Sequence, residues 1–255
     1  MFKLLHIHIL NVQYFIFRLH AGRLRGCIAK RKPVSTPQIR NRRMRWANVV
    51  QGWTVQQNWR HVIFSDEFRV TLFKCDGRVV VWRQEHERFL PQCMQMVRPE
   101  NRVGVMFWGC IGFGGRGHLV EIDGNMNRHR YIQVLQDHLI PSAADIFRQP
   151  DPRFIFQHDN APPHTARDTV AWMDQQPFNY MQWPAYSPDM NIIETVWGVI
   201  MQKLRANPPL TVAALRNRVM EHWAEITPQY LRNLYATLPR RIASLLRARG
   251  YPTKY

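Results

Sequence analysis

The sequence has few cysteines, and their spacing supports neither a disulfide framework nor a zinc ribbon. Its 255 residues include only four, without a C-x-x-C pair: Cys27, Cys75, Cys93 and Cys110. We therefore expect reduced intracellular thiols. Long apolar runs are also missing, because Lys, His, Asn, Gln and Arg interrupt the apolar residues 1–22 too often for a membrane span. No internal repeat is visible, which excludes a solenoid.

Acidic residues are scarce and unevenly placed. The chain carries 35 Lys and Arg against 18 Asp and Glu, a formal net charge of +17, and 29 of the 35 cations are Arg. Residues 1–65 hold 12 cations and no acid, residues 66–194 hold 13 cations and 16 acids, and residues 195–255 hold 10 cations and two acids. Since guanidinium grips phosphate with two donors, the Arg excess favours a nucleic-acid partner over a membrane surface. Acids concentrated between basic flanks suit a metal-dependent enzyme acting on a phosphodiester backbone, although a ribosomal or chromatin protein could share the flanks.

The hydrophobic pattern predicts strands followed by alternating helices and strands, which indicates a mixed α/β sheet. The predicted strands are 62–65, 68–73, 79–82, 103–111, 118–122, 153–158 and 178–182. The predicted helices begin after Thr36, cover 127–140, 165–174 and 191–204, begin again after Thr211 and Thr227, and end with 240–249.

A G-x-G-x-x-G run at positions 112–117 imitates a dinucleotide-binding turn. Such a turn must open a helix, whereas the pattern at 118–122 is that of a strand. We therefore predict a hairpin turn there. No G-K-[ST] follows, so a P-loop is excluded as well.

Basic residues cluster in and just before the helix that begins after Thr36. We predict that they contact phosphate: Lys30, Arg31 and Lys32 in a basic linker, and Arg40, Arg42, Arg43 and Arg45 on the helix. The alternative is an ordinary solvated helix face.

Three acids stand at or near the ends of predicted elements. Asp66 ends the first predicted strand, Asp159 ends strand 153–158, and Glu194 lies one turn into helix 191–204. If the two strands are neighbours in one sheet, their carboxyl ends bring both aspartates to one crevice, where the helix can add the glutamate. Such oxygen ligands suit Mg²⁺ or Mn²⁺, and a pair of ions about 3.5 to 4 Å apart can drive phosphoryl transfer. Taken singly, a strand-end Asp is more often a turn or capping residue.

The local sequence around these acids carries a resemblance. Residues 62–67 read VIFSDE, residues 158–166 read HDNAPPHTA, residues 183–197 read WPAYSPDMNIIETVW, and 34 residues separate Asp159 from Glu194. Over roughly residues 30–240, the chain resembles the Tc/mariner-superfamily transposases of the DDE kind. The segments correspond to the family's first-aspartate strand, its D-N-A-P-x-H-x-A segment and its W-P-x-x-S-P-D-L-N-P-I-E-N-x-W segment.

The resemblance implies a fold, a site and a reaction. The fold would be a ribonuclease-H-like mixed five-stranded sheet flanked by helices, and the metal-binding and catalytic triad would be Asp66, Asp159 and Glu194 with two Mg²⁺ or Mn²⁺ ions. The family cleaves double-stranded DNA at terminal inverted repeats, and the freed 3′-hydroxyl attacks target DNA at a TA step. We place His164 among the nucleic-acid contacts, expect His158 to face away from Asp159, and expect Asp189 to cap the helix that carries Glu194.

We predict three parts of the chain: a basic N-terminal arm over 1–57, the catalytic domain over 58–206, and a basic helical C-terminal tail over 207–255. Family members carry helix-turn-helix units ahead of the catalytic domain, and residues 1–57 lack that pattern. We expect a nuclear protein that forms a homodimer on DNA and does not bind a membrane. Two alternatives stay open: a catalytically silent or domesticated DNA-binding remnant, and a ribonuclease-H-type nuclease that acts on hybrids or junctions.

Overall fold

A computed structural model describes residue 14 and residues 35–72, 104–149 and 153–255. The chain divides into two compact units, Met1–Pro33 and Val34–Tyr255, and the fold described below is that of the second. Several predictions lie outside the described residues: the apolar segment 1–22, the basic residues Lys30, Arg31 and Lys32, the strand 79–82 and the turn before it.

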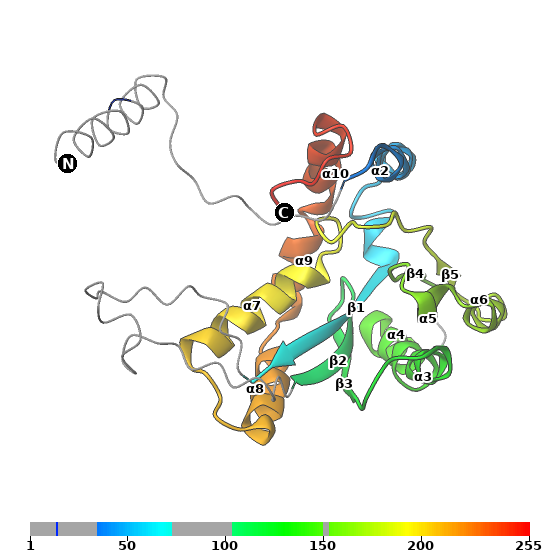
Figure 1. Ribbon diagram of the computed structural model, residues 1–255. Coiled ribbons are helices and arrows are strands. Elements are labelled where there is room, and N and C mark those ends of the chain that lie inside the picture. The colour runs from blue at the N-terminus through cyan, green and yellow to red at the C-terminus, as the bar shows by residue number, and fades with distance from the viewer. Residues whose placement is uncertain (1–13, 15–34, 73–103, 150–152) are drawn as a thin grey trace, which may run out of the picture. The chain divides into compact units, whose positions relative to one another are not determined.

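The described strands form one mixed sheet of five, as predicted. They are β1 (Val62–Thr71), β2 (Gly104–Ile111), β3 (Arg116–Ile122), β4 (Ile155–Gln157) and β5 (Asn179–Tyr180), in the spatial order β3-β2-β1-β4-β5 (Figure 1). β2 pairs antiparallel with both β1 and β3. β4 pairs parallel with both β1 and β5, so the carboxyl ends of these three strands lie at one edge of the sheet.

β1 is one continuous strand where the sequence predicts two, 62–65 and 68–73. β2 pairs with it through the acidic positions, placing Asp66 opposite Gly109 and Glu67 opposite Trp108, so the backbone stays extended there. Along β1, β4 pairs only with Val62–Phe64. The prediction that Asp66 ends the first strand is therefore wrong: Asp66 lies mid-strand, just beyond the point where β4 leaves β1.

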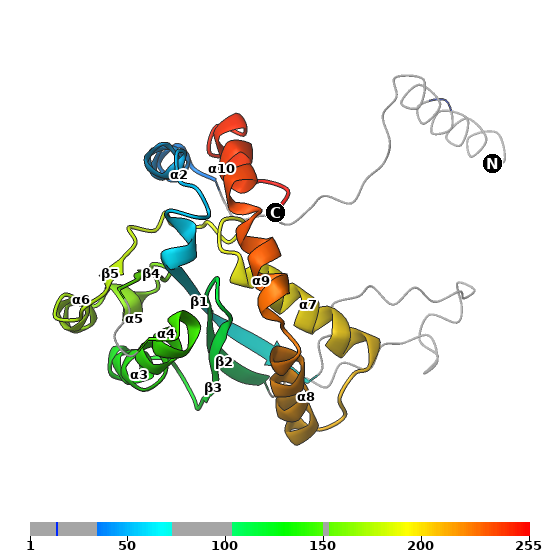
Figure 2. The ribbon, with the colours of Figure 1, turned by 180° about the vertical axis from the view of Figure 1, so that it is seen from behind.

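Helices cover both faces of the sheet. On one face lie α2 (Pro37–Val50), α7 (Ile193–Ala206), α8 (Val212–Ala224), α9 (Pro228–Tyr235) and α10 (Leu238–Arg247), which share one apolar core with β1 and β2. On the other lie α3 (Arg128–Val134), η4 (Leu135–Leu139), α4 (Ile140–Phe147) and α6 (Arg167–Met173). In Figure 2, which is seen from behind, α8 and α9 lie apart from α3 and α4. None of the helices in the described part of the chain is long and apolar enough to cross a membrane.

Alternation along the strands divides the core between the two faces. Phe64 and Phe107 pack toward α7 and its neighbours, whereas Ile63 and Trp108 pack toward α3 and α4. The same alternation sends the side chains of Asp66 and Glu67 to opposite faces of the sheet.

The connection between β2 and β3 is the hairpin predicted for the glycine-rich run. The amide of Gly112 donates to the carbonyl of Gly115 over 2.8 Å, and β3 continues antiparallel to β2. The rejection of a dinucleotide-binding turn is thus confirmed.

Three helices start at the predicted threonine caps. The hydroxyls of Thr36, Thr211 and Thr227 accept hydrogen bonds from backbone amides in the first turns of α2, α8 and α9. The helix predicted over 127–140 instead runs through α3, η4 and α4 to Phe147, because a π-helical turn precedes Pro141, which sits in the first turn of α4. Two short helices, η1 (Trp59–His61) and α5 (Pro162–Thr165), complete the described elements. The domain boundaries after residues 57 and 206 stay a prediction.

Candidate active site

Three carboxylates line one cleft at the edge of the sheet. Asp66 comes from β1, Asp159 follows β4 by two residues, and Glu194 is the second residue of α7. All three line a cleft of about 300 Å³. The structure therefore brings together the acids that the sequence singles out, through the parallel neighbours β1 and β4 and the helix laid beside them.

Two side-chain amides connect the segment before α7 to β1 and to the residues that follow β4. The amide of Asn191 donates to the carbonyl of Ser65 over 3.2 Å, next to Asp66. The amide of Asn160 donates to the carbonyl of Trp183 over 2.9 Å, next to Asp159. Ser65 is the neighbour of Asp66 and Asn160 is the neighbour of Asp159, so these two bonds hold the segment before Glu194 close to both aspartates.

Asp66 is oriented by two donors. Its carboxylate accepts from the amide of Glu67 over 2.9 Å and from the indole Nε1 of Trp197 over 3.3 Å. Trp197 itself stacks between Phe68 and Trp223, with ring centroids 4.9 and 5.2 Å away. The direction of the Asp66 carboxylate thus depends on packing in the core behind the cleft.

The pKa values of Asp66 and Glu194 are both raised, because the two carboxylates are buried close to other acids. Burial, and then the charges of Glu194 and Glu67, raise the pKa of Asp66 well above its ordinary value. Burial and the charge of Asp159 raise the pKa of Glu194, against a hydrogen bond that it shares with Asp66. The cleft therefore holds more negative charge than its surroundings stabilise.

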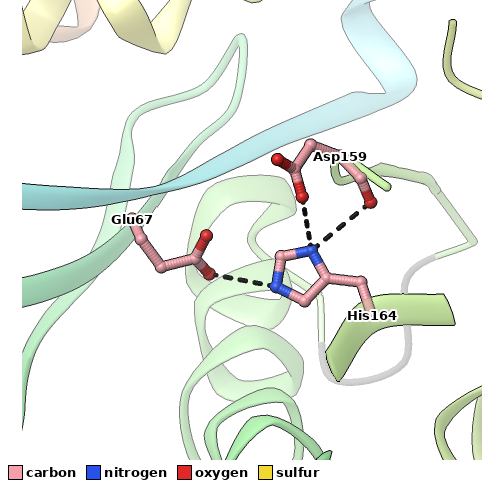
Figure 3. Close-up of side chains that lie close together, drawn as sticks. All are labelled: Glu67, Asp159 and His164. Atoms are coloured by element: carbon pink, nitrogen blue, oxygen red, sulfur yellow. Dashed lines mark hydrogen bonds and ion pairs between the residues drawn. The ribbon is translucent and has the colours of Figure 1, made fainter. Parts of the chain in front are cut away.

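His164 lies between two acids on the opposite side of β1 (Figure 3). Its Nδ1 is 2.7 Å from Oδ1 of Asp159, its Nε2 is 3.3 Å from Oε1 of Glu67, and its ring stacks on Tyr131 at 3.9 Å. Burial alone would lower the pKa of His164, but the hydrogen bonds to Asp159 and Glu67 outweigh it and raise the pKa to about 9. At neutral pH the ring is an imidazolium that forms ion pairs with both carboxylates.

Asp159 is kept ionised by the same contacts. Burial raises its pKa, but the hydrogen bond and charge of His164, with the amide of Ala161, lower the pKa below its ordinary value. The Asp159 side chain is still 53% exposed, so it stays open toward the cleft.

The donor set of the cleft fits a divalent cation. Asp66, Asp159 and Glu194 offer hard carboxylate oxygens, and their mutual repulsion is relieved by a positive ion. Among the residues that the structure describes, the one set whose donor atoms all lie within 4.8 Å of one another is Glu67, Asp159 and His164. Both ring nitrogens of His164 are protonated at neutral pH, so this second set can bind a metal only after losing a proton. The all-carboxylate set is the better ligand group.

Residues 61–216 match the family described as DDE superfamily endonuclease. This span covers more than half of the chain and includes all three acids of the cleft. The chain belongs to the DDE endonuclease superfamily.

Curated transposases are similar to this DDE endonuclease along nearly its whole length. It is 30% identical over 239 residues to the transposable element Tcb1 transposase of Caenorhabditis briggsae, covering 93% of this chain and 86% of that protein. It is 30% identical over 238 residues to the transposable element Tc1 transposase of Caenorhabditis elegans, with the same shares covered. These matches reach beyond the span of 30–240 predicted from the motifs. The endonuclease domain is therefore a transposase catalytic domain.

Solved structures confirm the predicted ribonuclease-H-like fold. The Mos1 transposase paired-end complex with left transposon end superimposes with a TM-score of 0.78 at 18% identity, covering 95% of this chain and 71% of that one. The catalytic domain of Mos1 mariner transposase superimposes with a TM-score of 0.67 at 17% identity, covering 88% of this chain and all of that one.

The predicted DNA-contact residues of this DDE endonuclease fall into two groups. Arg42 and Arg45 are exposed on α2, and Arg40 is partly buried over the ring of Tyr251. Contrary to the prediction that it contacts phosphate, Arg43 is 1% exposed and donates to buried acceptors. The structure also differs from the prediction for His164, which is 3% exposed and bound to acids. Neither buried side chain presents a surface to DNA.

Two other expectations concern the neighbours of the acids. His158 is buried against Phe156 and Tyr131, away from Asp159, as alternation predicts. Asp189 does not cap α7, whose N-cap residue is Ile192 without a side-chain bond. Its carboxylate instead binds Arg43 across 146 residues of sequence, a partner that no local pattern indicates.

Sequence reasoning missed two residues that shape the site. Glu67 follows Asp66 directly in β1. Strand alternation therefore predicts that its side chain lies on the opposite face of the sheet from Asp66, where it contacts His164. Trp197 falls at a helical core position, and only the structure shows its indole nitrogen on Asp66.

Proposed function

We propose that this chain is a DNA transposase whose catalytic centre is formed by Asp66, Asp159 and Glu194. The observation that carries the proposal is their convergence on one cleft from β1, β4 and α7. Burial and neighbouring carboxylates raise the pKa of Asp66 and that of Glu194, so a bound cation would relieve the repulsion in this cleft.

Two Mg²⁺ or Mn²⁺ ions held by these carboxylates would supply Lewis-acid stabilisation of the attacking and leaving oxygens in phosphoryl transfer. The other groups orient the ligands. Trp197 fixes Asp66, and His164 with Glu67 fixes Asp159 from the far side of β1. Solved structures similar to this chain include a Mos1 mariner paired end complex with Mn and one with Mg, which supports the choice of ions.

The substrate is double-stranded DNA, cleaved at the element's terminal inverted repeats and joined by a freed 3′-hydroxyl to target DNA at a TA step. The net charge of +17 and the exposed Arg42 and Arg45 on α2 support phosphate binding. Transposon-end complexes among the similar structures support the choice of partner and a homodimer that pairs two ends. Because the proposed substrate is DNA, we propose a nuclear location.

Metal-dependent nicking of supercoiled plasmid tests the proposal. The purified chain is compared with Asp66→Asn, Asp159→Asn and Glu194→Gln in Mn²⁺, with EDTA as a blank. Asp123→Asn is the matched control, because that carboxylate is 85% exposed and lies outside the cleft. We expect nicking by the unchanged chain and the control, and none by the three cleft variants.

Equal nicking by all variants would assign the activity to a contaminant or to another site. DNA binding without nicking by any of them would favour the catalytically silent remnant. Nicking confined to RNA–DNA hybrids or junctions would favour a ribonuclease-H-type nuclease.

A further inference from the structure

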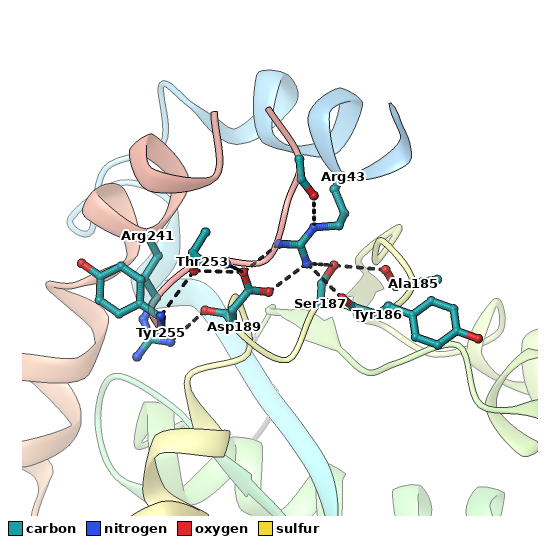
Figure 4. A network of polar contacts seen from close by, with 9 residues as sticks. Arg43, Ala185, Tyr186, Ser187, Asp189, Arg241, Thr253 and Tyr255 are labelled. Atoms are coloured by element: carbon teal, nitrogen blue, oxygen red, sulfur yellow. Dashed lines mark hydrogen bonds and ion pairs between the residues drawn. The ribbon is translucent and has the colours of Figure 1, made fainter. Parts of the chain in front are cut away.

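A buried polar network joins three distant parts of the chain around Asp189 (Figure 4). Arg43 from α2 donates to both carboxylate oxygens of Asp189, over 2.8 and 2.7 Å. Thr253 donates to the same carboxylate from its amide over 3.0 Å and from its hydroxyl over 2.9 Å. Arg43, Asp189 and Thr253 are 1%, 5% and 7% exposed, so all these bonds form away from water.

Arg43 uses its remaining donors on backbone and hydroxyl groups. Its Nε donates to the carbonyl of Gly250 over 3.0 Å, and its Nη1 donates to the carbonyl of Tyr186 over 3.0 Å and to the hydroxyl of Ser187 over 2.8 Å. A single guanidinium thus ties α2 to segment 250–253 and to the 185–191 loop. Only the forked geometry of Arg can serve these acceptors together.

Segment 250–253 is built to lie against α2. Gly250 has a φ of +80°, and a Cβ there would lie 2.6 Å from the carbonyl oxygen of Arg40. Only glycine allows both this backbone conformation and this close approach. The segment is therefore a fixed part of the network.

The 185–191 loop forms one wall of the catalytic cleft. Tyr186, Ser187 and Asn191 line the cleft beside the three acids. Tyr186 has a φ of +56°, a left-handed backbone conformation that is unfavourable for a residue with a side chain. Arg43 binds the carbonyl of this residue, so the strained turn depends on the network.

The network also reaches Glu194 from the other side. Arg241 donates to the carbonyl of Asp189 over 2.9 Å and to the hydroxyl of Thr195 over 2.9 Å. Thr195 follows Glu194 directly. The loop that precedes this acid and the residue that follows it are both held from α2, α10 and segment 250–253.

We propose that Arg43 is a positioning residue for the DDE centre: through Asp189, and with Thr253, it holds the 185–191 loop and Glu194 in the geometry that cleaves DNA. The inference rests on the proposed function. It assigns Arg43 a role inside the enzyme in place of the phosphate contact that the Arg-rich helix suggests.

The test compares Arg43→Lys, which keeps the charge but loses the fork, with Arg167→Lys, the same change at an exposed arginine of α6. Thr253→Val is a milder change to the network, and it decides the question if Arg43→Lys unfolds at the assay temperature. Three measurements are made on each folded variant: DNA binding by fluorescence anisotropy, single-turnover nicking across a Mn²⁺ titration, and hydrogen exchange of backbone amides.

We expect Arg43→Lys to bind DNA as the unchanged chain does, yet to nick about 10- to 100-fold more slowly, since misplacement of a catalytic group by about 1 Å has effects of this size. Thr253→Val should slow nicking less. The half-saturating Mn²⁺ concentration should rise in both. Amide exchange should quicken in the 185–191 loop but not in β1, whereas a general loss of stability would quicken both. Arg167→Lys should nick at the unchanged rate.

Normal nicking and Mn²⁺ dependence in folded Arg43→Lys or Thr253→Val would overturn the inference. So would a loss of nicking explained by weaker DNA binding or by faster exchange throughout the sheet. Failure of the proposed function looks different, because then Asp159→Asn would nick as well as the unchanged chain.

Discussion

Replacing Gly109 with alanine should destabilise the protein through its effect on Trp197. A Cβ at position 109 would lie 2.9 Å from the ring of Trp197 and 3.2 Å from both Leu119 and Trp223. Trp197 cannot retreat freely, because its ring stacks between Phe68 and Trp223. The added methyl group must therefore shift the indole that donates to Asp66.

Extra atoms in a packed core cost about 1 to 3 kcal/mol. For a protein of this size each kcal/mol lowers the melting temperature by about 2 to 4 °C, so the expected fall is about 2 to 12 °C. Gly198→Ala is the matched control. Position 198 lies within α7, and a Cβ there meets no atom within 4 Å. Alanine in this helix should raise stability by about 0.5 to 1 kcal/mol.

Thermal unfolding followed by circular dichroism measures both changes, and plasmid nicking measures the effect on Asp66. We expect opposite shifts in melting temperature for the two alanine variants, and slower nicking by Gly109→Ala at temperatures where it is folded. A melting temperature of Gly109→Ala at or above that of the unchanged chain would refute the packing argument. Normal nicking would refute the link from Gly109 to the acid centre.

Three further predictions follow from single contacts. Arg42→Gln and Arg45→Gln should each reduce the slope of log affinity for DNA against log salt by about one, measured by anisotropy, and an unchanged slope would remove these residues from the DNA surface. Trp197→Phe should keep the ring stacking but slow nicking, because it removes the donor to Asp66; nicking at the normal rate would contradict this. Burial alone would raise the pKa of Asp189, but Arg43 and Thr253 lower the pKa below its ordinary value. The stability that the carboxylate contributes should therefore be present above about pH 4 and be lost as the pH falls through the lowered pKa. In denaturant titrations the difference in unfolding free energy between the unchanged chain and Asp189→Asn should narrow below about pH 4, and a constant difference would contradict the pairing.

Local sequence patterns predicted most of the described helices and strands and singled out the three acids. Period-two and period-3.6 hydrophobicity marked the strands and helices, and threonine caps marked three helix starts. The acids could be found because each stands in a distinctive local motif. Where tertiary pairing decided the outcome, the predictions failed. β1 runs through Asp66 because β2 pairs with it there, which the local sequence does not encode.

Arg43 shows the same limit for a side chain. Its neighbours Arg42 and Arg45 are exposed, and a dense Arg run suggested one common surface. The helix turns Arg43 inward, and the acid that neutralises it lies 146 residues away. Local charge density could not predict this burial, because a cation can be buried only where a partner neutralises it, and the partner of Arg43 is distant in sequence.

Mn²⁺ binding followed by electron paramagnetic resonance tests whether Asp66, Asp159 and Glu194 hold the metal ions. Asp159 belongs to both possible ligand groups, so the decisive variants are those of its neighbours. We predict that Asp66→Asn and Glu194→Gln weaken Mn²⁺ binding strongly, whereas Glu67→Gln retains it. Loss of binding in Glu67→Gln, with normal binding in Asp66→Asn and Glu194→Gln, would place the metal with His164 on the other side of β1 and contradict the account.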